Sequence, residues 1–217
     1  KGHCFLSLSL MKVFCTTKRL VKQNMPLAGI DLQAAYFPTI DLEGALFPGA
    51  NFTSSTLEGA TFIRAHLDNA NFMQAKLRGS LFNKALLRNA NFMEADLREA
   101  DFSQARLYGA RFVGANLEGF YFEEGRIVER SENTILREAD LREVDFSNAN
   151  LTRVDLSGAS LAEANFSGAN LRDIQWNRQT IWDDVKGLDT AENIPSELLQ
   201  ELGLPRKSEV KTPNPQK

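Results

Sequence analysis

The sequence contains few of the residues that most often carry chemistry in proteins. Its 217 residues include only two Cys, two His, two Trp and three Tyr. Cys4 and Cys15 form no CxxC pair, and His3 and His66 are too separated to suggest a histidine-rich metal site. No stretch approaches 18 uninterrupted apolar residues, so no membrane-spanning helix is expected. We therefore expect no metal centre, no cofactor and no membrane span.

The chain also lacks a strong charge of either sign. Its 25 Lys and Arg residues stand against 28 Asp and Glu residues, a formal net charge of −3. A general polyanion binder needs a basic face to release counterions, so this balance argues against direct nucleic-acid binding. The motifs GxxxxGK(S/T), GxGxxG, HExxH and GxSxG are all missing. The sequence therefore predicts neither an enzyme nor a small-molecule substrate.

What the sequence does contain is an excess of Phe and a repeat. It has 15 Phe residues, far more than its Tyr and Trp together. From Leu27 to Phe122 every fifth residue is Leu or Phe, and a second run with the same period extends from Leu136 to Ile181. Two positions before each central residue stands a small residue, usually Ala, and the residue between them is often Asn or Asp. Such internal repetition indicates a solenoid.

A period of five fits neither an α-helix nor a flat strand, so the chain must turn after each short extended piece. The position two after each centre is often Gly or Asn, as at Gly44, Asn69 and Gly109. These residues tolerate the positive φ that a type II turn requires. Four such corners, one for each five-residue unit, close a square coil. Stacked coils would then hydrogen-bond as parallel strands about 4.8 Å apart.

Central residues that are four repeats apart in the sequence fall on the same face of the coil, so the central residues form four columns. Phe centres fall on two opposite faces, and Leu centres fall on the two faces between them. We predict a close-packed core from these inward side chains. The predicted core consists of Phe52, Leu57, Phe62, Leu67, Phe72, Leu77, Phe82, Leu87, Phe92, Leu97, Phe102, Leu107, Phe112, Leu117, Phe122, Phe146, Phe166 and Trp176. Asn51, Asn71 and Asn91 share an outward position, which predicts a short ladder of stacked amides.

Carboxylates are numerous enough for pairs to suggest a catalytic acid and base. Asp96/Asp101 and Asp140/Asp145 are examples, but each member occupies an outward position on adjacent faces of a regular repeat. There a carboxylate can accept hydrogen bonds from the backbone of a turn. We interpret these four residues as solvated ladder residues and assign no catalytic residue.

The two runs of repeats are out of step with one another. The centre passes from Phe122 to Leu136, which leaves four residues in excess of whole repeats. We predict a bulge or short loop near 128–133, at one corner of the coil. When the sides of the coil are counted one by one across this loop, Phe146 and Phe166 fall on the column that contains Phe122. The sequence therefore predicts one continuous solenoid.

The repeats match a known pattern. Residues 90–119 (ANFMEADLREADFSQARLYGARFVGANLEG) and 139–171 (ADLREVDFSNANLTRVDLSGASLAEANFSGANL) resemble the pentapeptide-repeat proteins, whose consensus is A(D/N)Lxx. The resemblance covers residues 25–182 and implies a right-handed quadrilateral β-helix. We therefore expect an all-β parallel solenoid of about seven to eight coils, with short capping segments at its ends.

The segments outside the repeat carry separate expectations. Residues 1–24 are basic and are interpreted as an N-terminal cap, with a targeting segment or a later start at Met11 as alternatives. Because an open stack exposes strand edges, residues 183–205 are expected to form a helical C-terminal cap. Ser196 is the predicted N-cap of that helix. Residues 206–217 are expected to be a disordered tail.

A regular core with variable outward residues predicts a non-enzymatic rigid scaffold that binds an unidentified protein partner. The outward residues behind this prediction are Arg64, His66, Lys76, Arg78, Lys84, Tyr108 and Arg111. The family resemblance implies one alternative: a mimic of duplex DNA that binds DNA gyrase or topoisomerase and protects it from quinolones or inhibits it. Mimicry requires a negative face. The cytoplasm is the default compartment, with the periplasm or thylakoid lumen as alternatives; the oligomeric state stays open.

Overall fold

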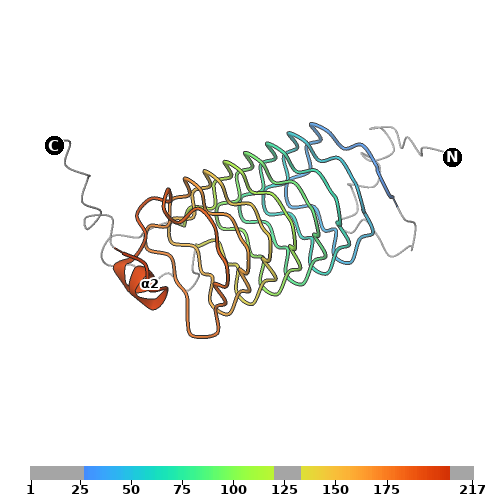
Figure 1. Ribbon diagram of the computed structural model, residues 1–217. Helices are drawn as coiled ribbons and strands as arrows, with labels where there is room; N and C mark the ends of the chain where they lie inside the picture. Colours follow the sequence, from blue (N-terminus) through green and yellow to red (C-terminus); the bar gives the residue numbers. More distant parts are fainter. Residues whose placement is uncertain (1–26, 120–132, 206–217) are drawn as a thin grey trace, which may run out of the picture.

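The chain folds into a rod of stacked square coils, shown in Figure 1 by a computed structural model that describes residues 27–119 and 133–205. Each side of a coil contributes one bridging residue to a parallel ladder. Asp31 bridges Asn51 and Asn51 bridges Asn71, a step of four five-residue repeats. Each of the four ladder rows is built from such single-residue bridges, so no longer strand forms among the described residues. The fold is therefore a four-sided parallel β-helix.

The corners are four-residue turns whose third residue has a positive φ. In the first of them, the Ile30 N–H donates to the Leu27 carbonyl at 3.2 Å, and Gly29 has φ +67°. The same conformation occurs where the sequence has no Gly or Asn, as at Lys84 (φ +60°) and Glu99 (φ +62°). An L-residue in this region costs about 1–2 kcal/mol. The strain at such corners must therefore be offset by the core.

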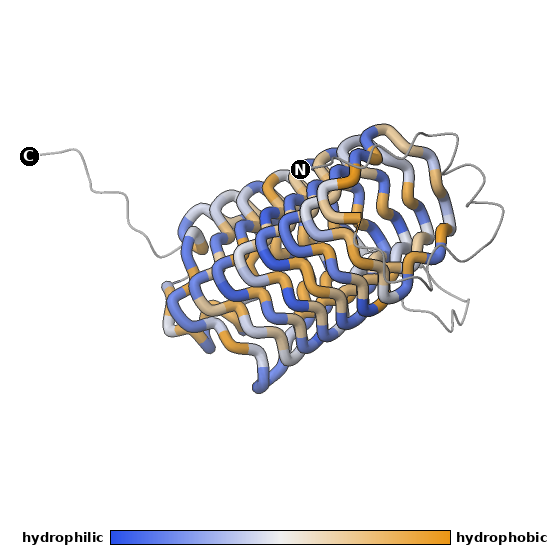
Figure 2. The backbone as a smooth tube through the Cα atoms, turned by 90° about the vertical axis from the view of Figure 1, so that its right-hand side faces the viewer, coloured by the Kyte–Doolittle hydropathy of each residue, from blue (hydrophilic) through white to orange (hydrophobic). Residues whose placement is uncertain are grey.

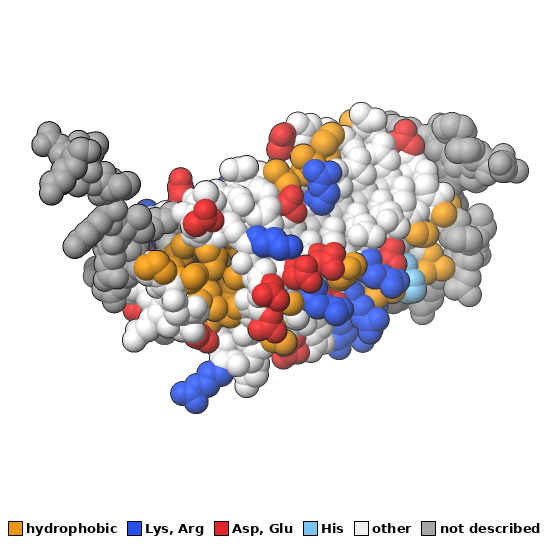
Figure 3. Space-filling view, in the orientation of Figure 1, with side chains coloured by type: hydrophobic (Ala, Val, Ile, Leu, Met, Phe, Trp, Pro, Cys, Tyr) orange, Lys and Arg blue, Asp and Glu red, His pale blue; other side chains and the backbone are white. Residues whose placement is uncertain are grey.

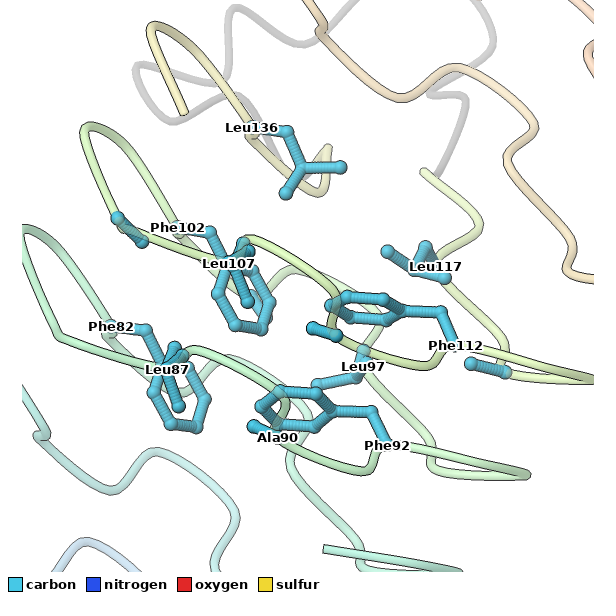
Figure 4. Packing of buried hydrophobic residues seen from close by; sticks show 14 of the residues in the cluster. Phe82, Leu87, Ala90, Phe92, Leu97, Phe102, Leu107, Phe112, Leu117 and Leu136 are labelled. Carbon is cyan, nitrogen blue, oxygen red and sulfur yellow. The ribbon is translucent and has the colours of Figure 1, made fainter. Parts of the chain in front are cut away.

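The core consists of stacked columns of side chains (Figure 4). Phe52 stacks on Phe72 with ring centroids 4.8 Å apart and an interplanar angle of 2°. On the opposite face Phe62 stacks on Phe82 at the same centroid distance, and rings of the two columns meet edge-on, as Phe62 and Phe72 do at 5.7 Å. Every repeat centre from Phe52 to Leu117 is fully buried. Figure 2 shows the resulting alternation of hydrophobic and hydrophilic residues along each coil.

The insertion between the two runs is longer than the sequence predicts. Bridging residues in neighbouring coils are normally four repeats apart in the sequence, a separation called the ladder step below. Asp101 bridges Ile135, and this ladder step is nearly three repeats longer than one coil. Phe146 stacks on Phe112 at 5.2 Å, and Phe166 follows it at 5.5 Å. Both rings therefore continue the column of Phe52, and the predicted assignment to the column of Phe122 is wrong.

The physical reason is that Ile135 directly follows Asp101 in its ladder row, so this row skips the residues in between. The predicted excess of four residues treated Phe122 as the centre of a regular side of the coil. Counting the faces through that position therefore assigned Phe146 and Phe166 to the wrong face. Phe122 itself, and almost all of the predicted insertion at 128–133, lie outside the described residues.

The last coils depart from the repeat. The ladder step exceeds one coil by one residue between Ser160 and Ile181 and by two between Asn170 and Glu192. Ile181 is therefore a bridging residue, 44% exposed, and Trp182 takes the inward position. The prediction that Ile181 is a centre was wrong by one residue. The solenoid continues to Glu192, through part of the segment that was expected to be a helical cap.

The end of the rod also differs from the sequence-based expectation in detail. Trp176 is only partly buried, and its indole Nε1–H donates to Glu201 at 2.8 Å, so it closes the end of a column rather than lying inside the core. Helix α2 spans Ser196–Glu201. Pro195 occupies its N-cap position and no side chain caps it, so the predicted N-cap at Ser196 was wrong. Leu198 is the helix residue that packs into the core.

Candidate functional surface

Because the interior is filled by Phe, Leu and Ala, chemistry and recognition are confined to the outward residues. Among residues 27–119 and 133–205, no group of three or more His, Cys, Asp or Glu is placed to hold a metal ion. In the same ranges, no helix is long and apolar enough to cross a membrane.

The outward amides serve the fold. The Asn91 amide donates to Asn71 Oδ1 at 3.0 Å, while Asn71 donates to Thr53 Oγ1 at 2.9 Å. Asn71 Oδ1 also accepts from the backbone N–H of Met73 at 3.2 Å. The predicted amide ladder is direct between Asn71 and Asn91 and passes through a threonine hydroxyl below them. These groups satisfy turns and one another, so they are not available as a ligand set.

Two of the four carboxylates considered as acid–base candidates are paired with arginines. Arg98 donates to both oxygens of Asp96 at 2.7 and 2.6 Å. Partial burial acts to raise the pKa of Asp96, but the hydrogen bonds and charge of Arg98 outweigh it and hold that pKa below its usual value. Arg142 binds Asp140 in the same way, at 2.7 and 2.8 Å. These hydrogen bonds lower the pKa of Asp140, against the opposing effect of burial.

The other two carboxylates bind turn backbone, as predicted for ladder residues. Asp101 accepts from the Ser103 N–H at 2.8 Å, and Asp145 accepts from the Ser147 N–H at 3.0 Å. All four carboxylates are thus engaged with an arginine or with a turn. None of the four is left without such a partner, whereas a general acid needs a carboxyl that is free to reach its substrate.

The structure spreads the predicted outward residues over all four faces. Ladder rows and turns assign them as follows: His66 and Tyr108 to one face, Lys76 and Arg78 to the opposite face, and Arg64 and Lys84 to a third, with Arg111 on the fourth. The first will be called the Tyr108 face, defined by the ladder row Leu46, His66, Leu86, Arg106 and Asp140, and the second the Lys76 face. The seven residues therefore do not form one site.

Arginine–carboxylate pairs link successive coils on the outside. Arg88 on the Tyr108 face binds Asp68 of the coil below at 2.8 Å, and Arg78 on the Lys76 face binds Glu99 of the coil above at 2.5 Å. The arginines are exposed and the carboxylates are partly exposed, and pairs at such surface positions contribute about 0–1 kcal/mol each. Figure 3 shows basic and acidic side chains side by side along the lower part of the view. The pairs neutralise one another and leave a surface of mixed charge.

One cluster on the Tyr108 face combines an aromatic ring, a cation and two carboxylates. The Tyr108 hydroxyl donates to Glu143 Oε1 at 2.7 Å, and this hydrogen bond raises the pKa of Tyr108. The Arg142 guanidinium lies 5.6 Å from the centre of the Tyr108 ring and is held in turn by Asp140. The cluster thus fixes an aromatic side chain on the outside of the rod.

Sequence reasoning found Tyr108 but missed its partners Arg142 and Glu143. The separation of Tyr108 and Glu143 in the sequence is one position more than the ladder step across the insertion, from Asp101 to Ile135. Without knowledge of that step, no sequence signal connects the two residues.

Comparisons with known proteins place this geometry in context. The protein-family model described as "Pentapeptide repeats" matches residues 27–62 and 133–173 of this chain in eight copies. A second family model, "Pentapeptide repeat region", matches residues 55–131. The search for similar curated proteins returned no match. The family matches imply the right-handed form of the β-helix.

Several solved structures are similar in part. HetL, a pentapeptide repeat protein involved in heterocyst differentiation regulation in Nostoc sp. strain PCC 7120, is 20% identical; the match covers 85% of this chain and 95% of HetL at a TM-score of 0.34. A protein of the Arabidopsis thaliana thylakoid lumen is 28% identical over 60% of this chain and 68% of its own, with a TM-score of 0.39. QnrB1, a plasmid-mediated fluoroquinolone resistance protein, is 17% identical over 82% and 98%, with a TM-score of 0.41. None of these similarities is close enough to assign a function.

Proposed function

The chain belongs to the pentapeptide-repeat family, and on that premise we propose that it is a non-enzymatic rigid scaffold that binds a protein partner through its Tyr108 face. The observation that carries this proposal is the Tyr108 cluster, an aromatic ring held in place by Glu143 and Arg142 on the outside of a rod whose interior is closed. Tyr and Arg are among the residue types most enriched at the energetic centres of protein interfaces.

Rigidity supports the proposal. Most backbone N–H groups of the described ladder and turn positions bond to neighbouring coils or within their own turn, as the Leu107 N–H does to the Asp140 carbonyl at 2.9 Å. A surface that is already ordered loses little conformational entropy when a partner binds. The Tyr108 hydroxyl bond reduces that cost further, since the ring does not need to be ordered on binding. The expected partner surface is one that offers an apolar contact to the ring and acceptors for the arginines.

The non-enzymatic part of the proposal rests on the carboxylates. Those most suggestive of catalysis are bound to arginines or to turn backbone, as Asp96 is to Arg98 and Asp101 is to Ser103. A solenoid filled by side chains also offers no opening along its described sides that reaches the core, where every centre from Phe52 to Leu117 is fully buried.

The test is a face-specific capture experiment from the native host, read by quantitative mass spectrometry. Tyr108→Ala with Arg142→Ala is expected to reduce capture of the specific partner at least tenfold, because a buried interface aromatic and its neighbouring arginine each contribute about 2 kcal/mol or more. The matched control is Lys76→Ala with Arg78→Ala on the opposite face, which should leave capture unchanged. Equal capture by both variants would refute the assignment of the Tyr108 face.

DNA mimicry is the alternative that the family suggests, and the charge pattern does not favour it. A mimic needs a continuous negative row, whereas Asp68 and Asp140 on the Tyr108 face are each matched by an arginine. A gyrase supercoiling assay, with and without a fluoroquinolone, tests it directly. Inhibition or protection at micromolar protein would replace the scaffold proposal.

We propose the cytoplasm as the compartment, because Cys4 and Cys15 precede the repeats in the sequence and cannot form a disulfide framework for the rod. N-terminal sequencing of the native protein tests this. A mature N-terminus near residue 20 would point instead to the periplasm or the thylakoid lumen.

A further inference from the structure

The C-terminal end of the rod carries an apolar groove between the last coil and α2. The groove has a volume of about 470 Å³, and its apolar lining comes from Trp182, Val185, Leu188, Ile194, Leu199 and Leu202. Figure 3 shows hydrophobic side chains gathered beside α2 at this end. The volume lies within the range of sites that hold a few side chains or a small molecule.

Two features of this groove suit it to a peptide. The indole Nε1–H of Trp182, which lines the groove, is buried and has no acceptor among the described residues. A buried donor without an acceptor is costly, so a carbonyl or hydroxyl brought by an occupant would be favourable there. Leu204, at the edge of the groove, is 40% exposed and would be covered by the same occupant.

Two residues that line the groove, Asp184 and Asp189, are acidic. Over residues 182–205 the acidic residues, all exposed, are Asp183, Asp184, Asp189, Glu192, Glu197 and Glu201. The only Lys or Arg in that range is Lys186, which pairs with Glu163 at 3.5 Å. Arg172 lies at a neighbouring hollow beside Glu197, and no Lys or Arg among the described residues lines the groove itself. An occupant should accordingly combine apolar side chains with basic ones.

One segment of the chain has that composition. Residues 1–26 contain apolar residues such as Phe5, Leu10 and Phe14 and no acidic residue. Their basic residues are Lys1, Lys12, Lys18, Arg19 and Lys22. The C-terminal residues 206–217 are also basic on balance, but Val210 is their one large aliphatic residue, so they offer little to fill the groove.

We propose that residues 1–25 of a second copy dock in this groove, so that rods associate head to tail. The described chain begins at Leu27 at one end of the rod and reaches the groove at the other (Figure 1). The longest ladder rows have eight levels, and the seven steps between them span about 34 Å at about 4.8 Å per step. Within one molecule the segment would have to follow the whole rod, along sides whose backbone groups already bond between coils. Between molecules it meets the groove directly.

The inference does not depend on the partner surface proposed above. A contact between two different surfaces is heterologous, so it continues from copy to copy unless the geometry closes a ring. The intact chain should therefore show assembly that grows with concentration beyond the dimer.

Sedimentation velocity over a concentration series tests the proposal, with intact mass confirming that residues 1–25 are present. Asp184→Lys with Asp189→Lys in the groove, or Lys18→Glu with Arg19→Glu in the segment, should each weaken association at least tenfold. An equimolar mixture of the two variants should associate again, because each reversed surface then finds a reversed counterpart. Glu58→Lys, a single charge reversal of the same kind on the side of the rod, is the control and should not alter association.

A synthetic peptide of residues 1–25, added to the intact protein, should compete and shorten the assemblies. Three results would overturn the proposal: a monomer at every concentration, a dimer that saturates at two copies, or a charge-reversed mixture that fails to reassociate. A compact monomer whose shape changes with the groove variants would instead assign the groove to the segment of the same molecule, and it too would overturn head-to-tail docking.

Discussion

Replacing Phe92 by Ala should create a cavity that the surrounding coils cannot close. The Phe92 side chain is fully buried, and its ring stacks on Phe72 and Phe112 at centroid distances of 4.9 Å. It also meets Phe82 edge-on at 5.8 Å and Phe102 at 5.6 Å. Removal of a buried Phe side chain costs about 3–5 kcal/mol, with roughly 24 cal/mol for each Å³ of cavity that remains.

The loss should lie in the upper half of that range, about 4–5 kcal/mol. The coils above and below are joined by short backbone bonds, such as Phe92 N–H to Arg111 O at 2.7 Å, so the cavity walls are held apart. Phe37→Ala is the matched control, because Phe37 lies in the first coils and is only partly buried. It should cost about 2 kcal/mol or less, since much of its area is never removed from water.

Urea unfolding measures the two losses. Far-UV circular dichroism follows the whole rod, and fluorescence follows Trp176 and Trp182 in the last coils. Because each coil is stabilised mainly by its neighbours, a cavity in the middle of the rod should lower the transition seen by both probes. A loss below about 1 kcal/mol for Phe92→Ala, or equal losses for the two variants, would refute the inward placement of this column.

Three further predictions concern the corners and the outside of the rod. Gly187→Ala should prevent the last coil from packing, since a Cβ there would overlap the backbone nitrogen of Ser167; its thermal unfolding midpoint should fall clearly. Lys84→Gly should stabilise the rod by about 0.5–1 kcal/mol, because the relief of positive φ exceeds the entropy cost of glycine; urea midpoints measure this. Asp140→Asn should flatten the acid limb of the stability profile. The bond from Arg142 lowers the folded pKa of Asp140, so its contribution is present above the unfolded pKa of about 3.9 and is lost as pH falls through the folded value.

Each of these three predictions has a control variant. Gly79→Ala introduces a Cβ that meets no neighbouring atom, so only the positive φ opposes it and the loss should stay at about 1 kcal/mol. Lys76 is a bridging residue and does not have a positive φ. Lys76→Gly should therefore destabilise the rod, whereas Lys84→Gly should stabilise it. Asp140→Asn made in an Arg142→Ala background should change the acid limb far less, because Arg142 is the main cause of the lowered pKa of Asp140. The opposite sign in any of these comparisons would contradict the corresponding argument.

The regular part of the rod could be predicted from the sequence because the repeat constrains it twice. A period of five requires turns, and the recurrence of Phe in the columns of Phe52 and Phe62 at every fourth repeat requires four sides. The stacked and edge-on geometries of these rings agree with that register. The fold class and the family therefore follow from local pattern alone.

The parts that failed are those where tertiary contacts replace the repeat. The phase of Phe146 depends on how many residues leave the coil after Leu117, and sequence counting cannot tell a residue that forms a side from one that does not. Trp182 displaces Ile181 from the inward position because the ladder gains one residue there. The Tyr108 cluster depends on how the coils pair across the insertion after Leu117, which the sequence does not reveal. Its partners Arg142 and Glu143 could therefore not be named in advance.

The step of the ladder has a consequence for how such a rod could be altered. One side is a single pentapeptide and one level is four of them, so removing four pentapeptides from the middle would shorten the rod and leave every later face in its direction. Removing one pentapeptide would keep an apolar residue at each inward position but rotate everything after the deletion by a quarter turn. The angle about the axis between the Tyr108 face and the C-terminal groove is therefore set by residue count, and it can be changed in quarter turns without redesigning either surface.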